Sequence, residues 1–370
     1  MPENAERQHR KRARLPPETE AVRRTVVEKT TGDSARLEEG LADKIQTVSP
    51  RRLILRRFFR SKLSMAGLVM IVALFLFSFL GPVFSPWGQT EVDYDNEQGR
   101  SSYIERKIEF TVDGATYEII DVARTVYTSN YLAPPSAKHW LGTDLEGRDV
   151  LTRIMYGGRI SLMIGFIVVF MSMFIGVLLG GLAGYYGRHV EQIVMRVVDI
   201  FNCLPTLPLL LIISALLEAF GVKGLSSIYW LMLVLTFFSW TGTARLVRGQ
   251  LLSLREQEFI LAAEAMGVPP MRKIFRHLIP NVIPQLIVGM TLALGSVILY
   301  EAALSFLGLG VPLPYAAWGT MINTITRHPE ILAGFPNVWI PPGLCIVTAV
   351  LAFNFIGDGL RDAFDPRAKR

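Results

Sequence analysis

The chain has 370 residues, of which 51% are hydrophobic and 19% are charged, and its net charge is +6. A soluble domain has about 25% charged residues, so this composition excludes an ordinary soluble protein and favours one embedded in a membrane. The two cysteines, Cys203 and Cys345, lie in or beside apolar segments. They exclude a disulfide framework and a cysteine-based metal site, and we expect both to be small core residues.

The first 64 residues are too polar for the hydrophobic region of a cleavable signal peptide. Residues 1–50 are rich in charge and poor in aromatic residues, which predicts a disordered cytoplasmic extension. Residues 51–64 predict an amphipathic helix that lies along the inner membrane surface. Its apolar face is expected to contain Leu55, Phe58, Phe59 and Leu63. A plain basic flank that only sets the topology is an equally good interpretation.

Segments without Asp, Glu, Lys or Arg are spread along the chain and predict an all-α integral membrane protein with six transmembrane helices. The segments are 65–84, 160–187, 200–217, 224–244, 281–300 and 331–357. A helix of roughly 20 residues crosses the hydrocarbon core, which each segment provides, although 200–217 needs its flanks. Only helices and closed barrels satisfy their backbone groups in lipid.

Basic residues set the expected orientation. In the short segments after the second span, twelve Lys and Arg residues fall on one side and two on the other. The positive-inside rule therefore places both termini in the cytoplasm. The resulting organisation is a first span at 65–85, an extracytoplasmic loop at 86–158, a core at 159–357 with a cytoplasmic loop at 248–281, and a cytoplasmic tail at 358–370.

The loop at 86–158 contains a hairpin signal. Asp113 and Gly114 suit the two central positions of a type I′ turn. The pairs that this turn would place on one apolar side are Ile108 with Ile119, Phe110 with Tyr117, and Val112 with Ala115. A two-stranded ribbon is marginal by itself, so we expect it either to pack on the helix ends as a lid or to touch an external partner.

The same loop ends in charged residues before the second span. Thr143 or Asp144 can cap the start of that helix. Asp144, Arg148 and Asp149 are close enough in sequence to form an ion-pair cluster, which we interpret as a structural clasp or as a contact with the pathway or a partner. Within the second span, small residues allow a close approach of another helix. They are Gly176, Gly180, Gly181 and Gly184.

The cytoplasmic stretch "EFILAAEAMGVPPMRKIFRHLIPN" predicts two short helices between two spans. Its alanines, Ala262, Ala263 and Ala265, give a helix surface with little side-chain bulk, which suits a groove on another protein. Gly267 can end the first helix and the following Pro-Pro pair prevents its continuation. A second helix over 271–278 is then expected to turn back to the membrane at Pro280.

This stretch resembles the "EAA" loop of ATP-binding-cassette importer permeases. Ala262, Ala263, Gly267, Ile279 and Pro280 match its pattern, while Leu261 stands in place of the Glu and His277 in place of the first Ile. Further segments resemble the C-type permease of dipeptide, oligopeptide and nickel importers, and the resemblance covers residues from about 50 to 370. They are "HWLGTDLEGRDVLTRIMYGGRISL", "GGLAGYYGRHVEQIVMRVVDIF", "EAALSFLGLGVPLPYAAWGTMI" and "LAFNFIGDGLRDAFDPR".

The resemblance implies a type I importer permease fold in a prokaryotic inner membrane. It implies as partners a second permease, two cytosolic ATPases that bind ATP and Mg, and an extracytoplasmic binding protein. No cofactor and no catalytic residue is expected in this chain, which has no phosphate loop. The residues implied to contact an ATPase are Glu258, Leu261, Ala262, Ala263, Gly267, Arg272, His277, Ile279 and Pro280.

The sequence is compatible with more than one substrate and more than one transport mechanism. Peptides are the expected cargo, and nickel chelates, glutathione or oligosaccharides are the alternatives within the same family. Glu301, expected near the outer end of the fifth span, is a candidate for the pathway or a partner contact. A structural bond to neighbouring backbone is at least as good an interpretation of it. A secondary transporter would explain the spans, but neither the elbow-like cytoplasmic segment nor the lack of charges within the spans.

Overall fold

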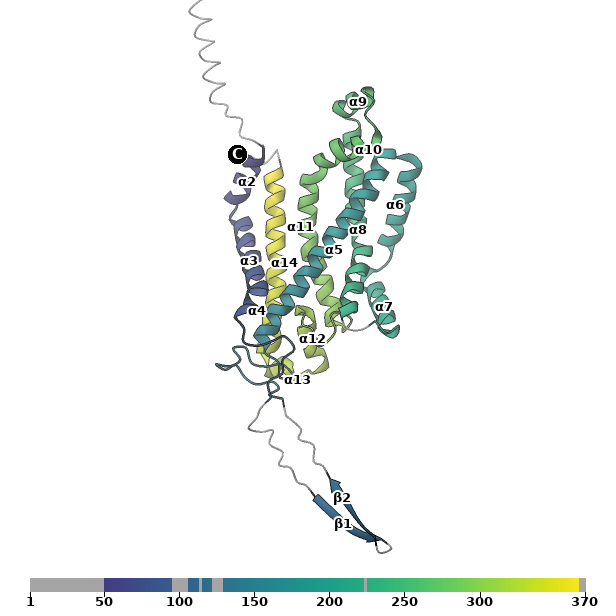
Figure 1. Ribbon diagram of the computed structural model, residues 1–370. Coiled ribbons are helices and arrows are strands. Elements are labelled where there is room, and N and C mark those ends of the chain that lie inside the picture. Colours follow the sequence, from purple (N-terminus) through teal and green to yellow (C-terminus); the bar gives the residue numbers. More distant parts are fainter. Residues whose placement is uncertain (1–49, 95–105, 113–114, 122–128, 223–224, 366–370) are drawn as a thin grey trace, which may run out of the picture. The chain divides into compact units, whose positions relative to one another are not determined.

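A computed structural model describes residues 50–94, 106–112, 115–121, 129–222 and 225–365 (Figure 1). The chain divides into two compact units, Met1–Leu53 and Ile54–Arg370. The predicted N-terminal extension and the last five residues of the tail lie outside the described residues. The second unit is almost entirely helical.

Five described helices are long and apolar enough to cross a membrane, and one bent pair raises the number to six. The five are α3 (Lys62–Phe79), α5 (Val150–Tyr186), α8 (Leu225–Arg255), α11 (Ile279–Phe306) and α14 (Pro336–Phe364). Each overlaps most of one predicted apolar segment, although α3 ends before residue 84 and α14 starts after residue 331. α5 and α8 run well beyond those segments, so the cytoplasmic loop expected at 248–281 starts only after Arg255.

The predicted span at 200–217 is two helices. α6 (Arg188–Cys203) and α7 (Thr206–Ala219) meet at an angle of 84°. Leu204 between them is extended, with φ −82° and ψ 133°. Pro205 follows it, and a proline disfavours the helical conformation in the preceding residue. The local sequence therefore breaks the span that its apolar composition predicts.

α5 lies at the centre of the bundle and packs most extensively on α8. Its glycines make this contact possible, because an added Cβ at Gly176 would lie 2.6 Å from Cβ of Thr243, and one at Gly184 would lie 2.8 Å from Cβ of Leu251. Gly180 approaches the backbone of Ala244 in the same way. The small residues of the second span thus serve packing within this chain.

Short helices close the two ends of the bundle. Figure 1 shows α4 (Gly81–Phe84), α12 (Trp318–Arg327) and α13 (Glu330–Gly334) at one end and α9 (Glu258–Ala265) at the other. The predicted sixth span began at residue 331, but α13 ends before Phe335, and α14 starts only at Pro336. The apolar composition of 331–335 belongs to a cap on the bundle.

Strands β1 (Arg106–Val112) and β2 (Ala115–Asp121) pair antiparallel. The register joins Ile108 to Ile119 and Phe110 to Tyr117, as the sequence predicts. The turn at 113–114 and the side chains of the predicted apolar face lie outside the described residues.

The predicted amphipathic segment at 51–64 is helix α2 (Pro50–Arg60), which is separated from α3 by Ser61. The hydroxyl of Ser61 accepts a hydrogen bond from the backbone N–H of Ser64, which starts a new helix. Phe58 was predicted on the outward apolar face, but it is buried. Leu55 and Phe59 are exposed as expected.

Candidate functional site

The segment 258–278 after α8, called the elbow below, starts with α9. The end of α9 is fixed by two backbone hydrogen bonds. The N–H of Val268 donates to the carbonyl of Ala263 at 3.1 Å, and the N–H of Gly267 donates to that of Glu264 at 2.9 Å. These two bonds form a Schellman motif. Gly267 has φ +73°, which a residue with a side chain adopts only with strain. The sequence prediction that Gly267 ends this helix is confirmed.

One face of α9 packs on its own chain. Ile260 is fully buried and Ala263 is 4% exposed. Ile260 belongs to a cluster with Val247 and Leu251 of α8 and with Ile274. The interpretation that Ala263 belongs to a surface for another protein is therefore wrong. Its missing bulk lets α9 lie close to its own bundle.

The opposite side of the elbow is apolar and exposed. Leu261 is 55% exposed, Met266 76% and Met271 54%. Ala262 and Ala265 are exposed beside them. These five residues are called the elbow surface below. Large apolar side chains gathered at the end of a bundle, outside the spans, are typical of a protein contact.

The second half of the elbow is continuous with the next span. α10 (Pro270–Arg272), the π-helix η1 (Lys273–Leu278) and α11 follow each other without a break. Pro280 was expected to turn the chain, but it lies in the first turn of α11, directly after η1, and the helix continues through it. A proline has no N–H to donate to a preceding turn, so it lies where the wider turn of η1 already makes the hydrogen bonding irregular. No separate second helix exists at 271–278.

Polar contacts hold this half in place. Lys273 is 3% exposed and its Nζ lies 3.6 Å from Oε2 of Glu264 and 5.5 Å from the ring centre of Tyr185. The carbonyl of His277 accepts a hydrogen bond from Nδ2 of Asn281 at 2.6 Å. Of the remaining predicted contact residues, Glu258 and Arg272 are exposed, whereas Ile279 is half-buried.

A groove between α8 and α11 was missed by the sequence prediction. It consists of a cavity of about 210 Å³ that α5 also lines, and of one of about 500 Å³ that reaches the end of α14. Leu246, Gln285 and Gly289 line both. Thr243 is half-buried and Gln285 exposed, and an added Cβ at Gly289 would meet nothing within 4 Å. Only the spatial pairing of two helices brings these residues together.

The start of α5 carries a buried polar network, called the α5 network below. Its residues are Asp93, His139, Asp144, Arg148, Asp149 and Arg153, each at most 7% exposed. Their positions explain why the sequence prediction was only partly correct.

Asp149, and neither of the predicted residues Thr143 and Asp144, caps α5. Its Oδ2 accepts hydrogen bonds from the N–H of Thr152 at 2.8 Å and from the Thr152 hydroxyl at 2.7 Å. Its other oxygen lies 2.9 Å from Nδ1 of His139. Asp149 does not join Asp144 and Arg148 in the predicted ion-pair cluster, because its carboxylate is committed to the cap and the imidazole.

His139 joins two carboxylates. Its Nε2 lies 3.2 Å from Oδ2 of Asp93, and its ring stacks on Trp87 with 4.7 Å between the centres. Asp93 also binds Nζ of Lys138 at 2.6 Å and Nδ2 of Asn130 at 3.2 Å. Burial alone would raise the pKa of Asp93, but hydrogen bonds from Lys138, Asn130 and His139 outweigh burial and lower it.

Asp144 pairs with two arginines. Its Oδ2 lies 3.2 Å from Nε of Arg148, as predicted, and 3.1 Å from Nε of Arg153, which the sequence prediction missed. Burial raises the pKa of Asp144 above its usual value, against the opposing effect of both guanidinium groups. Both arginines also donate to the carbonyl of Pro314, at 3.4 Å and 3.1 Å. The network ties the start of α5 to the segment after α11.

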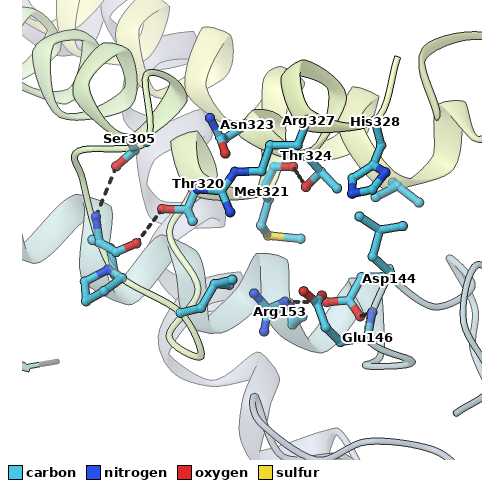
Figure 2. A pocket seen from close by; sticks show the side chains of 16 residues that line it. Asp144, Glu146, Arg153, Ser305, Thr320, Met321, Asn323, Thr324, Arg327 and His328 are labelled. Carbon is cyan, nitrogen blue, oxygen red and sulfur yellow. Dashed lines mark hydrogen bonds and ion pairs between the residues drawn. The ribbon is translucent and has the colours of Figure 1, made fainter. Parts of the chain in front are cut away.

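A cavity of about 150 Å³ lies against this network. Figure 2 shows Asp144, Glu146 and Arg153 on one side of it and Arg327 and His328 on the other. Acidic groups thus face basic ones across the space, although Asp144 and Arg153 are already paired with each other.

Glu301 lies inside the bundle. It is fully buried on α11, where its two oxygens accept hydrogen bonds from the hydroxyls of Ser161 at 2.9 Å and Ser305 at 2.8 Å. A fully buried side chain neither lines a pathway nor contacts a partner in this structure. Its bonds are structural, but they go to two side-chain hydroxyls and not to the neighbouring backbone that the sequence analysis expected.

Comparisons with known proteins cover most of the chain. Residues 176–370 match the family "Binding-protein-dependent transport system inner membrane component", and residues 49–101 match the "N-terminal TM domain of oligopeptide transport permease C". A putative peptide permease protein of Brucella suis is 47% identical over 64% of this chain and 75% of its own length. The dipeptide transport system permease protein DppC of Bacillus subtilis is 38% identical over 85% of each chain.

A search of solved structures finds the MetNI methionine ABC transporter in an inward-facing conformation. The likeness has a TM-score of 0.44 and 21% sequence identity, and it covers 58% of this chain and 97% of that one.

Proposed function

The chain belongs to the family of inner membrane components of binding-protein-dependent transport systems, and we propose that it forms one half of the pathway of a peptide importer. The observation that carries this proposal is the family match over residues 176–370, from the end of α5 to the end of the chain, together with the relatives that match most of their own length. These relatives include a dipeptide permease and a putative peptide permease. We further propose that its bundle is a type I importer permease fold.

The elbow surface is the proposed contact for an ATPase subunit. It is apolar, exposed and outside the spans, and its backbone is held by the cap at Gly267 and by the buried Ile260. A rigid apolar projection can occupy a groove on a partner. ATP and Mg would be bound by that partner, and this chain would remain without catalytic residues. The excess of basic residues supports placing the elbow and both termini in the cytoplasm.

The groove between α8 and α11 is the proposed wall of the pathway. Thr243 and Gln285 offer hydrogen bonds at its surface, and Gly289 leaves room for a moving substrate. The cavity that α5 also lines has no charged residue. Neutral polar groups suit a cargo whose peptide backbone is constant and whose side chains vary, because amide groups are hydrogen-bond donors and acceptors. A second, homologous permease would supply the facing wall.

The remaining partner is an extracytoplasmic binding protein that delivers the peptide. On the proposed orientation, the α5 network lies on the side that this protein approaches. Cargo selection would rest mainly with the binding protein, since the groove has few groups that distinguish side chains.

Peptide uptake by the complete complex tests the proposal. The chain would be reconstituted in vesicles with the permease, ATPases and binding protein encoded with it, and uptake of a labelled tripeptide would be measured with and without ATP. We expect ATP-dependent uptake that Gln285→Ala and Gly289→Phe reduce, and that the elbow variant Met266→Glu abolishes.

Phe220→Glu provides the matched control for the elbow variant. Phe220 is 82% exposed and Met266 is 76% exposed, so the two side chains are similarly accessible. Phe220 follows α7 and is distant in sequence from the elbow. Uptake of a nickel chelate or an oligosaccharide in place of the peptide would overturn the proposal that the cargo is a peptide. Uptake that needs an ion gradient but no ATP would overturn the transporter class.

A further inference from the structure

Helix α2 presents three different faces over its residues 54–60. One face packs on the bundle, where Phe58 is 8% exposed and lies against Gly359 of α14. On the same side, Nη1 of Arg57 donates to the carbonyl of Asp365 at 3.0 Å. This end of α2 is therefore attached to the last turn of α14.

The second face is apolar and uncovered. Leu55 is 55% exposed and Phe59 53% exposed, and the two lie one helical turn apart. Leu63 at the start of α3, which is 63% exposed, continues the same apolar side toward the exposed residues of the first span, such as Val69. α2 thus prolongs the lipid-facing surface of α3 beyond the span.

The third face is basic. Arg56 and Arg60, again one turn apart, are exposed, and so is Lys62. Within the described part of the chain, none of the three has an ion-pair partner. An exposed apolar row beside an exposed basic row is the pattern of a helix at a membrane surface. If α2 lay in water, the apolar side chains of Leu55 and Phe59 would be exposed to it. If α2 lay in the hydrocarbon region, its three cations would lose their solvation.

We propose that α2 binds anionic phospholipid headgroups, with Arg56, Arg60 and Lys62 on the phosphates and Leu55 and Phe59 among the acyl chains. The occupant follows from the charge, since a zwitterionic surface offers no net attraction to three cations. Because Arg57 and Phe58 attach α2 to the end of α14, the bound lipid also holds that end. Phe364 and Asp365 there line the larger cavity of the α8–α11 groove, so anionic lipid would steady one border of the proposed pathway.

A lipid titration of the purified full-length chain tests this directly. Fluorescent phosphatidylglycerol and fluorescent phosphatidylcholine would each be titrated onto the protein in neutral detergent. We expect tighter binding of phosphatidylglycerol, which added salt weakens because the attraction is electrostatic. Arg56→Gln with Arg60→Gln should weaken it about 25-fold, since each basic residue near an anionic surface contributes about a factor of five.

The matched control is Arg196→Gln with Arg276→Gln, which removes the same charge from exposed positions on α6 and η1 that also have no ion-pair partner in the described part of the chain. It should leave the phosphatidylglycerol affinity within about twofold, and Arg56→Lys with Arg60→Lys should largely restore it. Equal affinities for the two lipids, or equal losses in the α2 variant and the control, would refute the proposal. Far-ultraviolet circular dichroism of each variant establishes that the bundle is intact.

Hydrogen exchange gives a second readout that does not depend on transport. In vesicles with phosphatidylglycerol, the amides at the end of α14 should exchange more slowly than in vesicles of phosphatidylcholine alone. The difference should disappear in Arg56→Gln with Arg60→Gln. A lipid effect on these amides that persists in this variant would show that the lipid acts elsewhere.

Discussion

The α5 network and the elbow, at the two ends of the bundle, differ in which side chains they bury. The network buries six ionisable side chains and gives each a partner on another segment. The elbow exposes large apolar side chains and is held by backbone hydrogen bonds and a few buried residues. Satisfied buried polar groups fix a structure, whereas uncovered apolar groups are free to bind another molecule. Stability is therefore expected to depend on one region and coupling on the other.

The largest effect on stability is expected when the carboxylate of Asp149 is removed from the α5 network. Asp149→Ala takes away the cap of α5 and leaves the buried His139 without one of its partners. A lost cap costs about 1 kcal/mol and a stranded buried polar group about 1–3 kcal/mol, so we expect about 3 kcal/mol of destabilisation. Chemical unfolding in detergent measures it, and an unchanged midpoint would mean that the network does not stabilise the fold.

A pair of alanines separates the two faces of α9. Ala263→Arg introduces a charge at a buried site, where we expect about 2 kcal/mol of local destabilisation and loss of the elbow structure. Ala262→Arg changes the exposed face, so the elbow should remain folded while binding of the ATPase is lost. Limited proteolysis of the elbow and co-purification of the ATPase distinguish them. Equal protease sensitivity of the two variants would contradict the assignment of faces.

Two glycines test whether the cap at Gly267 matters for coupling. Gly267→Ala forces a side chain into a left-handed conformation at a cost of about 1 kcal/mol, and nothing crowds the added Cβ. Gly221→Ala imposes the same strain, since its φ is +81° and its surroundings are equally open. Only the first should lower peptide-stimulated ATP hydrolysis. A similar loss in both variants would trace the effect to strain in general.

The smallest effect is expected at Glu301, which is buried like the α5 network but away from it. Glu301→Gln keeps the shape of the side chain. Its amide oxygen can accept from one serine hydroxyl and its NH2 can donate to the oxygen of the other, so the free energy of unfolding should change by less than about 1 kcal/mol. Peptide uptake should stay within about twofold of the unchanged protein. A large loss of uptake with unchanged stability would return Glu301 to the pathway.

The sequence was sufficient for the apolar helices, because charge-free segments of spanning length have few other uses. It also predicted the hairpin register, since Asp113-Gly114 and the alternating residues agree. The prediction of the helices failed where a single residue, such as a proline, opposed the average hydropathy of its segment. Pro205 breaks the third span, although the hydropathy of the segment remains high, and the apolar residues before Pro336 form a separate cap on the bundle.

The backbone conformation of the candidate site could be predicted from the sequence. Which side chains of its helices are buried could be predicted less well. Gly267 acts through local geometry, which the sequence carries directly. The burial of Ala263 and of Glu301 depends on which neighbouring helix covers them, and periodicity within one helix contains no such information. His139 and Arg153 reach the α5 network from different segments, so a prediction based on spacing along the chain found Arg148 and missed them.

The unbroken path from α10 through η1 to α11 has a mechanical consequence. Helices resist bending and compression, so a displacement of Met271 must either move the far part of α11 as one body or be absorbed at η1, where the wider π-turn is the least regular link. Gln285 and Gly289 lie only two and three turns beyond that link. A push on the elbow that η1 does not absorb would thus reach the proposed wall of the pathway, with Pro284 inside α11 as a second place where the helix can bend.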